Sequence, residues 1–213
     1  MTDDPHAGAP LERAGASLAD ASVAMLLVHG RGASATGILG LATEIDRDDV
    51  AYLAPQADGN TWYPQSFLAP RASNQPHLDS ALARIDDVLE TVVDAGVEAE
   101  RTVLLGFSQG ACLASECAAS SPRRYGGVVA LSGGLIGSTV DHDRYQGSLD
   151  GTPAFFGCSD VDPHIPVERV HDSVHVYESL EADVTERIYE GMGHTINDDE
   201  LTYIRELVDD LAD

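Results

Sequence analysis

One pentapeptide, Gly106 to Gly110, constrains this chain more than any other stretch, because Ser108 lies between two glycines in the pattern G-x-S-x-G. The run at residues 102–105 precedes it and is typical of a buried strand, and the run at residues 111–119 follows it and is typical of a helix. Such a strand, turn and helix in succession favour a tight, strained turn that lifts the serine hydroxyl above the sheet. Ser108 is therefore a candidate nucleophile, with a plain Gly/Ser turn as the alternative.

Apolar runs alternate with stretches of helical periodicity along nearly the whole chain. Predicted strands lie at residues 23–28, 51–54, 102–105, 127–132, 153–157 and 184–189, and predicted helices at 38–45, 78–95, 111–119, 167–180 and 198–211. The pattern predicts an α/β fold with a mostly parallel central sheet flanked by helices. Residues 23–213 are expected to form a single domain, and residues 1–22 are expected to be either an edge strand or a partly loose segment.

The charge of the chain is strongly one-sided. It has 36 acidic and 12 basic residues, a formal net charge of −24, and every basic residue is an arginine. Such a surface repels nucleic acid and anionic membranes, so we expect neither as a partner. We interpret the charge as an adaptation to concentrated salt, because a Debye length of about 3 Å at 1 M salt screens the self-repulsion. A merely acidic protein is the alternative interpretation.

Several other kinds of site have no signature in the sequence. The longest apolar run, residues 23–28, is far shorter than the roughly 20 residues of a membrane span, and the N-terminus does not resemble a signal peptide. Cys112, Cys117 and Cys158 lack zinc-ligand spacing and are expected to be buried, reduced thiols. No P-loop and no G-x-G-x-x-G loop occurs. We therefore expect a cytoplasmic protein that uses no cofactor and no metal.

Polar residues follow four of the predicted strands: His29 to Arg31, Ser108, Asp160 with Asp162, and His194. Because ligands in parallel sheets bind beyond the carboxyl ends of the strands, we expect these side chains to converge there. A serine hydroxyl needs a base, which His194 can supply, and the imidazole needs a carboxylate that fixes its tautomer. The residues alone leave open whether Asp160 or Asp162 is that acid.

An acyl-enzyme reaction at Ser108 would also need donors for the oxyanion. We expect one to be the backbone N–H of Gln109 and the other the backbone N–H of Arg31. Because backbone groups would do this, the side chain at position 31 is expected to be free to vary, and its charge could attract a carboxylate. His29 is expected to shape its loop through hydrogen bonds to the backbone. The remaining histidines are expected on the surface or in loops, with His164 a candidate for lining the site.

Four motifs together resemble those of the phospholipase/carboxylesterase family of α/β-hydrolases, which includes the acyl-protein thioesterases: residues 29–32, 106–110, 162–166 and 191–194. The resemblance runs from about residue 23 to the end of the chain, and the charge suggests a haloarchaeal or other halophilic member. It implies an α/β-hydrolase fold without a large cap domain. It also implies that Ser108 is the nucleophile, Asp162 the acid and His194 the base, in the chain order of such triads. Arg31 and Gln109 would supply the oxyanion N–H groups.

Two features depart from the thioesterase branch of that family. Arg31 stands where that branch usually has an apolar residue, and residues 60–64 look more like the bacterial and archaeal esterase branch. We therefore expect a serine carboxylesterase that acts on small esters or thioesters, with lysophospholipase or acyl-protein thioesterase activity as the alternative. A ligand-binding protein with little turnover is the alternative from another class, and a homo-oligomer stays open.

Substrate selection is expected to depend on apolar side chains in two loops: Trp62, Tyr63, Phe67, Leu135 and Ile136. If they line a pocket, the group that they accept is apolar and modest in size. For Trp62 the alternative is a packing role beneath its loop.

Overall fold

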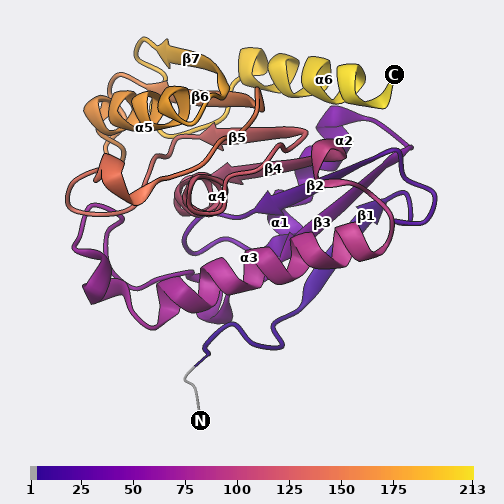
Figure 1. The fold of residues 1–213 in the computed structure, drawn as a ribbon, viewed down its shortest axis with the longest axis horizontal. Helices are drawn as coiled ribbons and strands as arrows, with labels where there is room; N and C mark the ends of the chain where they lie inside the picture. Colours follow the sequence, from indigo (N-terminus) through magenta and orange to yellow (C-terminus); the bar gives the residue numbers. More distant parts are fainter. Residues whose placement is uncertain (1–3) are drawn as a thin grey trace.

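Residues 4–213, which the computed structural model describes, contain seven strands in one sheet. The strands are β1 (Leu11–Gly15), β2 (Val23–Val28), β3 (Val50–Pro55), β4 (Thr102–Phe107), β5 (Gly127–Leu131), β6 (Pro153–Ser159) and β7 (Asp183–Tyr189). Their order across the sheet is β1-β3-β2-β4-β5-β6-β7 (Figure 1). β1 runs antiparallel to β3, and the other neighbouring pairs are parallel. The mostly parallel sheet predicted from the sequence is therefore confirmed.

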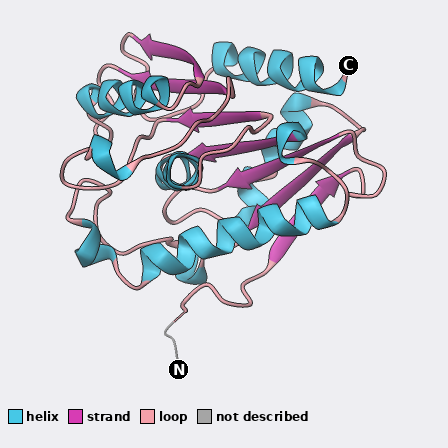
Figure 2. Cartoon of the chain, in the orientation of Figure 1, coloured by secondary structure: helices cyan, strands magenta, loops and turns pink. Residues whose placement is uncertain are grey.

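Helices cover both faces of this sheet. They are α1 (Ala35–Ile38), α2 (Gly40–Ile45), α3 (His77–Asp94), α4 (Gln109–Ser120), α5 (Val167–Ser179) and α6 (Asp198–Ala212). Helices α3, α4 and α5 pack on one face, and α1, α2 and α6 pack on the other (Figure 1, Figure 2). Successive side chains of a strand point to opposite faces, so Leu26 of β2 belongs to the first core and Met25 and Leu27 belong to the second. This double burial explains why β2 is apolar throughout.

The N-terminal segment contributes an edge strand, which is one of the two outcomes that the sequence left open. β1 pairs with β3 along its whole length, from Leu11 opposite Pro55 to Gly15 opposite Ala51. Residues 1–3 of the predicted segment lie outside the described residues.

The helical stretch predicted around residues 38–45 is confirmed, with two differences. A turn at Leu39 divides it into two short helices, α1 and α2, and the first begins earlier, at Ala35. The side chain of Ser34 caps α1 by accepting a hydrogen bond from the backbone N–H of Gly37 (3.1 Å). Such a cap satisfies a free N–H of the first turn and fixes where a helix begins.

The carboxyl ends of four parallel strands bring the predicted site residues to one edge of the sheet. Arg31 follows β2, Ser108 follows β4, Asp162 follows β6 and His194 follows β7. The connections nearest to this edge, residues 56–76 and 132–152, contain only single turns of 3₁₀ helix in the described chain. Among residues 4–213, none of the helices has the length and apolar character that crossing a membrane requires.

Candidate active site

Ser108 has a strained backbone at the turn between β4 and α4. Its φ is 57° and its ψ is −120°, a conformation that a residue with a Cβ rarely adopts. A Cβ on Gly106 would lie 2.2 Å from Gly110 O, and a Cβ on Gly110 would lie 2.0 Å from Val28 O. Both glycines are therefore required for α4 to pack this closely on the sheet, and the turn costs about 1–3 kcal/mol in strain.

Ser108, His194 and Asp162 form a continuous chain of hydrogen bonds. The Ser108 hydroxyl lies 2.9 Å from His194 Nε2, and His194 Nδ1 lies 2.6 Å from Asp162 Oδ2. An ionised carboxylate only accepts hydrogen bonds, so the proton lies on Nδ1 and Nε2 accepts from the serine. In this tautomer the imidazole is ready to take the proton of Ser108.

Asp162, and not Asp160, contacts the imidazole. The side chain of Asp162 is fully buried, and its Oδ1 accepts hydrogen bonds from the backbone N–H groups of His164 (2.8 Å) and Ile165 (3.1 Å). Burial alone would raise the pKa of Asp162, but the hydrogen bond from His194 and these two backbone donors hold the pKa below its ordinary value. Asp160 instead accepts from the backbone N–H of Gly191 (2.7 Å).

The loop that carries His194 is held by its backbone. Gly191 and Gly193 have φ values of 66° and 80°, which glycine adopts without strain. The N–H of Gly193 donates to Ser159 Oγ at the end of β6 (3.0 Å), and Asp160 holds Gly191. Both partners of this loop therefore come from the β6 end that also presents Asp162.

Two backbone N–H groups are available beside Ser108. Gly30 approaches Ser108 so closely that an added Cβ would lie 3.3 Å from Ser108 Cβ, which brings the next residue, Arg31, to the rim of the same pocket. Gln109 is the first residue of α4, where backbone N–H groups lack helical acceptors. In residues 4–213, neither of these two N–H groups donates to a backbone or side-chain acceptor. They are suited to an oxyanion.

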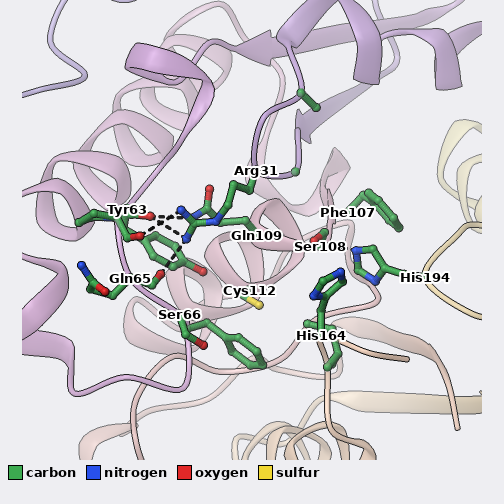
Figure 3. A pocket seen from close by; sticks show the side chains of 15 residues that line it. Arg31, Tyr63, Gln65, Ser66, Phe107, Ser108, Gln109, Cys112, His164 and His194 are labelled. Atoms are coloured by element: carbon green, nitrogen blue, oxygen red, sulfur yellow. Dashed lines mark hydrogen bonds between the residues drawn. The ribbon is translucent and has the colours of Figure 1, made fainter. Parts of the chain in front are cut away.

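A pocket of about 530 Å³ opens above Ser108. Ser108, His194 and His164 lie at one side of it, and Arg31 lies at the other with Tyr63 and Gln65 (Figure 3). Its apolar lining comes from Tyr63, Phe67, Phe107, Cys112 and Ile165. In the described chain no aspartate or glutamate lines it, although the protein has 36 acidic residues.

A scan against protein families gives a match that spans nearly the whole chain. The matching family is described as Phospholipase/Carboxylesterase, and the match covers residues 16–211. The chain belongs to the phospholipase/carboxylesterase family. The resemblance noted in the sequence motifs is thereby confirmed.

Named relatives and solved structures agree with this placement. Acyl-protein thioesterase 1 of Saccharomyces cerevisiae is 33% identical over 124 residues, which are 57% of this chain and 55% of the yeast protein, so the match spans about half the yeast protein's length. Acyl-protein thioesterase 1 of Eremothecium gossypii is 28% identical over 226 aligned positions that cover 95% of each chain. A phospholipase/carboxylesterase structure from Dyadobacter fermentans is 40% identical, with a TM-score of 0.91 over 94% of this chain and 96% of that one. The predicted α/β-hydrolase fold is confirmed.

Three of the five predicted pocket residues do not line the pocket of this phospholipase/carboxylesterase family member: Trp62, Leu135 and Ile136. Trp62 is completely buried, and its Nε1 donates to His29 O (2.9 Å), so it packs beneath the loop. Leu135 and Ile136 are held toward the helices, because their N–H groups donate to Ser173 Oγ (2.9 Å) and Glu116 Oε2 (3.0 Å). Tyr63 and Phe67 do line the pocket.

Cys112 is a pocket residue that the sequence reasoning missed. It lies one turn after Ser108 on α4, and its N–H donates to Ser108 O (3.1 Å). The helical spacing of four residues is the signal that could have found it. Burial raises the pKa of its thiol to about 12, so it stays a neutral part of the wall. All three cysteines are buried and free, as predicted.

The histidines outside the triad have different surroundings. His29 is buried, its Nδ1 donates to Gly30 O (2.8 Å) and its Nε2 accepts from the N–H of Ala57 (3.2 Å), which confirms the predicted loop-shaping contacts. Burial lowers the pKa of His29. His164 lines the pocket, with its ring 5.0 Å from that of His194. His6 lies in a turn, as expected of a loop histidine, and it is fully buried there, with Nε2 2.8 Å from Trp62 O.

Proposed function

We propose that this protein is a serine carboxylesterase that hydrolyses small carboxylic esters or thioesters through an acyl-enzyme. The observation that carries the proposal is the unbroken hydrogen-bond chain Ser108–His194–Asp162, with distances of 2.9 Å and 2.6 Å, at the edge of a pocket. The family of this chain and its named relatives support the same chemistry. The roles of the individual residues are part of the proposal.

Acylation begins when the Ser108 oxygen attacks the carbonyl carbon of the ester. Its proton passes to His194 Nε2, and the electron pair of the C=O bond moves onto the carbonyl oxygen. The backbone N–H groups of Arg31 and Gln109 donate to that oxyanion. When the C=O bond re-forms, the alcohol or thiol leaves with the proton from His194, and Ser108 holds the acyl group.

Deacylation repeats these steps with water. His194 takes a proton from the water as its oxygen attacks the acyl carbon, and the proton then returns to Ser108 as the acid leaves. Asp162 stays ionised throughout, because its hydrogen bonds hold its pKa below the ordinary value. Its negative charge stabilises the imidazolium that forms twice in each cycle.

The size and lining of the pocket support substrates of modest length. A volume of about 530 Å³ lies within the range of small-molecule sites, and Tyr63, Phe67, Cys112 and Ile165 offer an apolar wall to an acyl or alcohol chain. No acidic side chain of the described residues lines the pocket, so it does not repel the developing oxyanion.

The test is release of p-nitrophenol from acetate, butyrate and octanoate esters in molar KCl by wild type and Ser108→Ala. We expect wild type to turn over and the variant to be inactive while melting at a similar temperature. Equal activity of the two proteins would contradict a serine nucleophile. A folded wild type without turnover would support the ligand-binding alternative.

A thioesterase is the second candidate, because relatives named acyl-protein thioesterase 1 match this chain. The thioester and the oxyester would use the same acyl-enzyme and differ in the leaving group. Comparing kcat/KM for a butyryl thioester and for p-nitrophenyl butyrate separates the two preferences. Activity toward a lysophospholipid, measured in the same series, tests the lysophospholipase alternative.

The charge of the chain supports a high-salt setting for this activity. A net charge of −24 without lysine is self-repulsive in dilute buffer, and concentrated KCl screens that repulsion. We expect the melting temperature to rise between 0.1 M and 3 M KCl, measured by calorimetry. Equal melting temperatures at the two concentrations would contradict the adaptation.

A further inference from the structure

The side chain of Arg31 lies against the loop of residues 62–65. Its Nη1 donates to Pro64 O (3.1 Å), and its Nη2 donates to the carbonyl oxygens of Tyr63 (2.9 Å) and Gln65 (2.7 Å) (Figure 3). Three main-chain carbonyls thus hold one planar guanidinium, whose rigid fork of donors allows little rotation once these bonds form. These contacts argue against the expectation that this side chain is free to vary.

The side chain of Gln109, the first residue of α4, contacts the same loop. Its Nε2 donates to Tyr63 O (2.8 Å), and its Oε1 accepts from the backbone N–H of Trp62 (3.0 Å). Gln109 is buried, so these bonds are shielded from water. The Tyr63 carbonyl therefore accepts hydrogen bonds from both Arg31 and Gln109.

We propose that the side chains of Arg31 and Gln109 are positioning residues that hold the oxyanion hole in place by clamping it to the Tyr63 carbonyl. The inference rests on the proposed function, in which the backbone N–H groups of these two residues bind the oxyanion. Arg31 lies between Gly30 and Gly32, and Gly32 has a φ of 74°. A segment flanked by glycines has little stiffness of its own. Two backbone hydrogen bonds support it, from Gly32 N–H to Asn60 O (2.7 Å) and from Ala33 N–H to Gly30 O (3.2 Å), and the clamp adds the contacts of the two side chains.

The same contacts argue against a carboxylate receptor at Arg31. Both terminal nitrogens of its guanidinium already donate to carbonyl oxygens of the protein. These bonds use three of the five N–H groups, so a substrate carboxylate would find only the remaining two. The clamp therefore favours neutral esters, and it predicts that loss of Arg31 changes kcat more than KM.

The test compares wild type with Arg31→Leu, Arg31→Lys and Gln109→Leu on p-nitrophenyl butyrate, with kcat and KM measured separately. Arg205→Leu is the matched control, because the Arg205 guanidinium also donates to a main-chain carbonyl, Glu44 O (2.8 Å), at a site outside the pocket. Each variant is also inhibited with a trifluoromethyl ketone of the same chain length. The melting temperature of each variant confirms that it folds.

The ketone isolates the oxyanion hole from the leaving group. Its carbonyl carbon forms a bond to the Ser108 oxygen, the serine proton moves to His194 Nε2, and the C=O electron pair becomes an oxyanion. No bond breaks to release an alcohol, so the affinity reports on how well the hole accepts the oxyanion.

For Arg31→Leu we expect kcat to fall by roughly 10- to 100-fold, because a displaced donor loses most of its value while the N–H itself remains. KM should change by less than about threefold, and ketone affinity should fall by the same factor as kcat/KM. Arg31→Lys should lie in between, because one ammonium replaces a fork of donors. Arg205→Leu should match wild type.

Because both side chains share the Tyr63 carbonyl, Arg31→Lys and Gln109→Leu combined should lose less than the product of their separate losses. If Arg31→Leu does not fold, these two variants and their combination carry the test. A folded Arg31→Leu with wild-type kcat, or with a raised KM and unchanged ketone affinity, would overturn the clamp. Activity in Ser108→Ala would instead overturn the proposed function, so the two failures are distinct.

Discussion

Replacing Asp162 with asparagine is expected to abolish turnover while leaving the fold intact, and the reason lies in the two oxygens of this side chain. Oδ2 accepts from His194 Nδ1 at 2.6 Å, and Oδ1 accepts from the backbone N–H groups of His164 and Ile165 at 2.8 and 3.1 Å. An asparagine has one carbonyl oxygen for these two places. Because two fixed backbone N–H donors face the position of Oδ1, the amide oxygen of the asparagine is expected to occupy that position.

The amide nitrogen of Asp162→Asn then faces His194. It donates to Nδ1, so the imidazole carries its own proton on Nε2 and can no longer accept the proton of Ser108. The geometry of the triad is kept, but the base has the wrong tautomer. A tautomer error of this kind lowers kcat by about 10³- to 10⁴-fold, or roughly 4–5.5 kcal/mol in activation free energy.

The assay is kcat for p-nitrophenyl butyrate at pH 7.5, with melting temperatures measured in parallel. Asp160→Asn is the control, because an amide oxygen at position 160 can still accept from the Gly191 N–H, which lies 2.7 Å from Asp160 Oδ1. We expect this control to stay within about threefold of wild type, as a change outside the reacting groups should. Asp162→Asn with more than a tenth of wild-type kcat, or an equal loss in Asp160→Asn, would refute the reasoning.

Acid stability gives an independent check on the same carboxylate. The pKa of Asp162 in the folded protein is held below its ordinary value of 3.8. Stability from this ionised group is thus fully present above about pH 4 and is lost as the pH falls through the folded pKa. An asparagine does not titrate, so Asp162→Asn should lack this loss of stability in acid. At pH 7.5 the carboxylate of the wild type is fully ionised, so the two rates can be compared without a correction for its protonation.

Three further predictions concern stability and substrate length. Burial raises the pKa of Glu200 from its ordinary value of 4.5 to about 7 in the folded protein. The folded state therefore holds this proton more tightly than the unfolded state, and the wild type should lose up to about 3 kcal/mol of stability as the pH rises from 4.5 to 7. Urea titrations at both pH values should show this loss in the wild type and not in Glu200→Gln. Cys112→Phe should lower kcat/KM for the octanoate ester at least about tenfold relative to the acetate ester, because the added ring occupies pocket space that a long acyl chain needs. Trp62→Phe should cost about 1–3 kcal/mol by leaving His29 O without its donor, with acyl-length preference unchanged; a changed preference would contradict its packing role.

The parts of the site that the sequence predicted are those that local pattern determines. Gly106 and Gly110 are required by contacts within the strand, turn and helix that they join and with the neighbouring strand, so their spacing around Ser108 indicated the turn directly. The order of apolar runs fixed which loops follow parallel strands, and the carboxyl ends of those strands meet at one edge. Asp162 and His194 could therefore be assigned to the same place as Ser108, although they lie far from it in the sequence.

The pocket walls could not be predicted in this way, because they depend on side-chain contacts between distant segments. Leu135 is apolar and follows a strand, as a pocket residue would, but its carbonyl accepts from Arg169 (2.9 Å) and its N–H donates to Ser173 Oγ (2.9 Å) on α5. These two contacts hold it away from the pocket. No sequence pattern around Leu135 or within α5 indicates that Arg169 and Ser173 are the partners of Leu135.

Position 31 shows why a backbone role does not leave a side chain free. The N–H of any residue at that position could donate to an oxyanion, which is why the sequence suggested that the side chain would vary. Yet an N–H group lowers the activation free energy fully only when it already points at the position of the oxyanion before the reaction. If the loop had to reorient during the reaction, the free energy of that change would offset the stabilisation of the transition state. The loop that contains Gly30 and Gly32 has two kinds of contact with the neighbouring loop: the N–H of Gly32 donates to Asn60 O (2.7 Å), and the guanidinium of Arg31 donates to the Tyr63 carbonyl. In the proposed mechanism, the side chain and the backbone of one residue thus serve the same oxyanion.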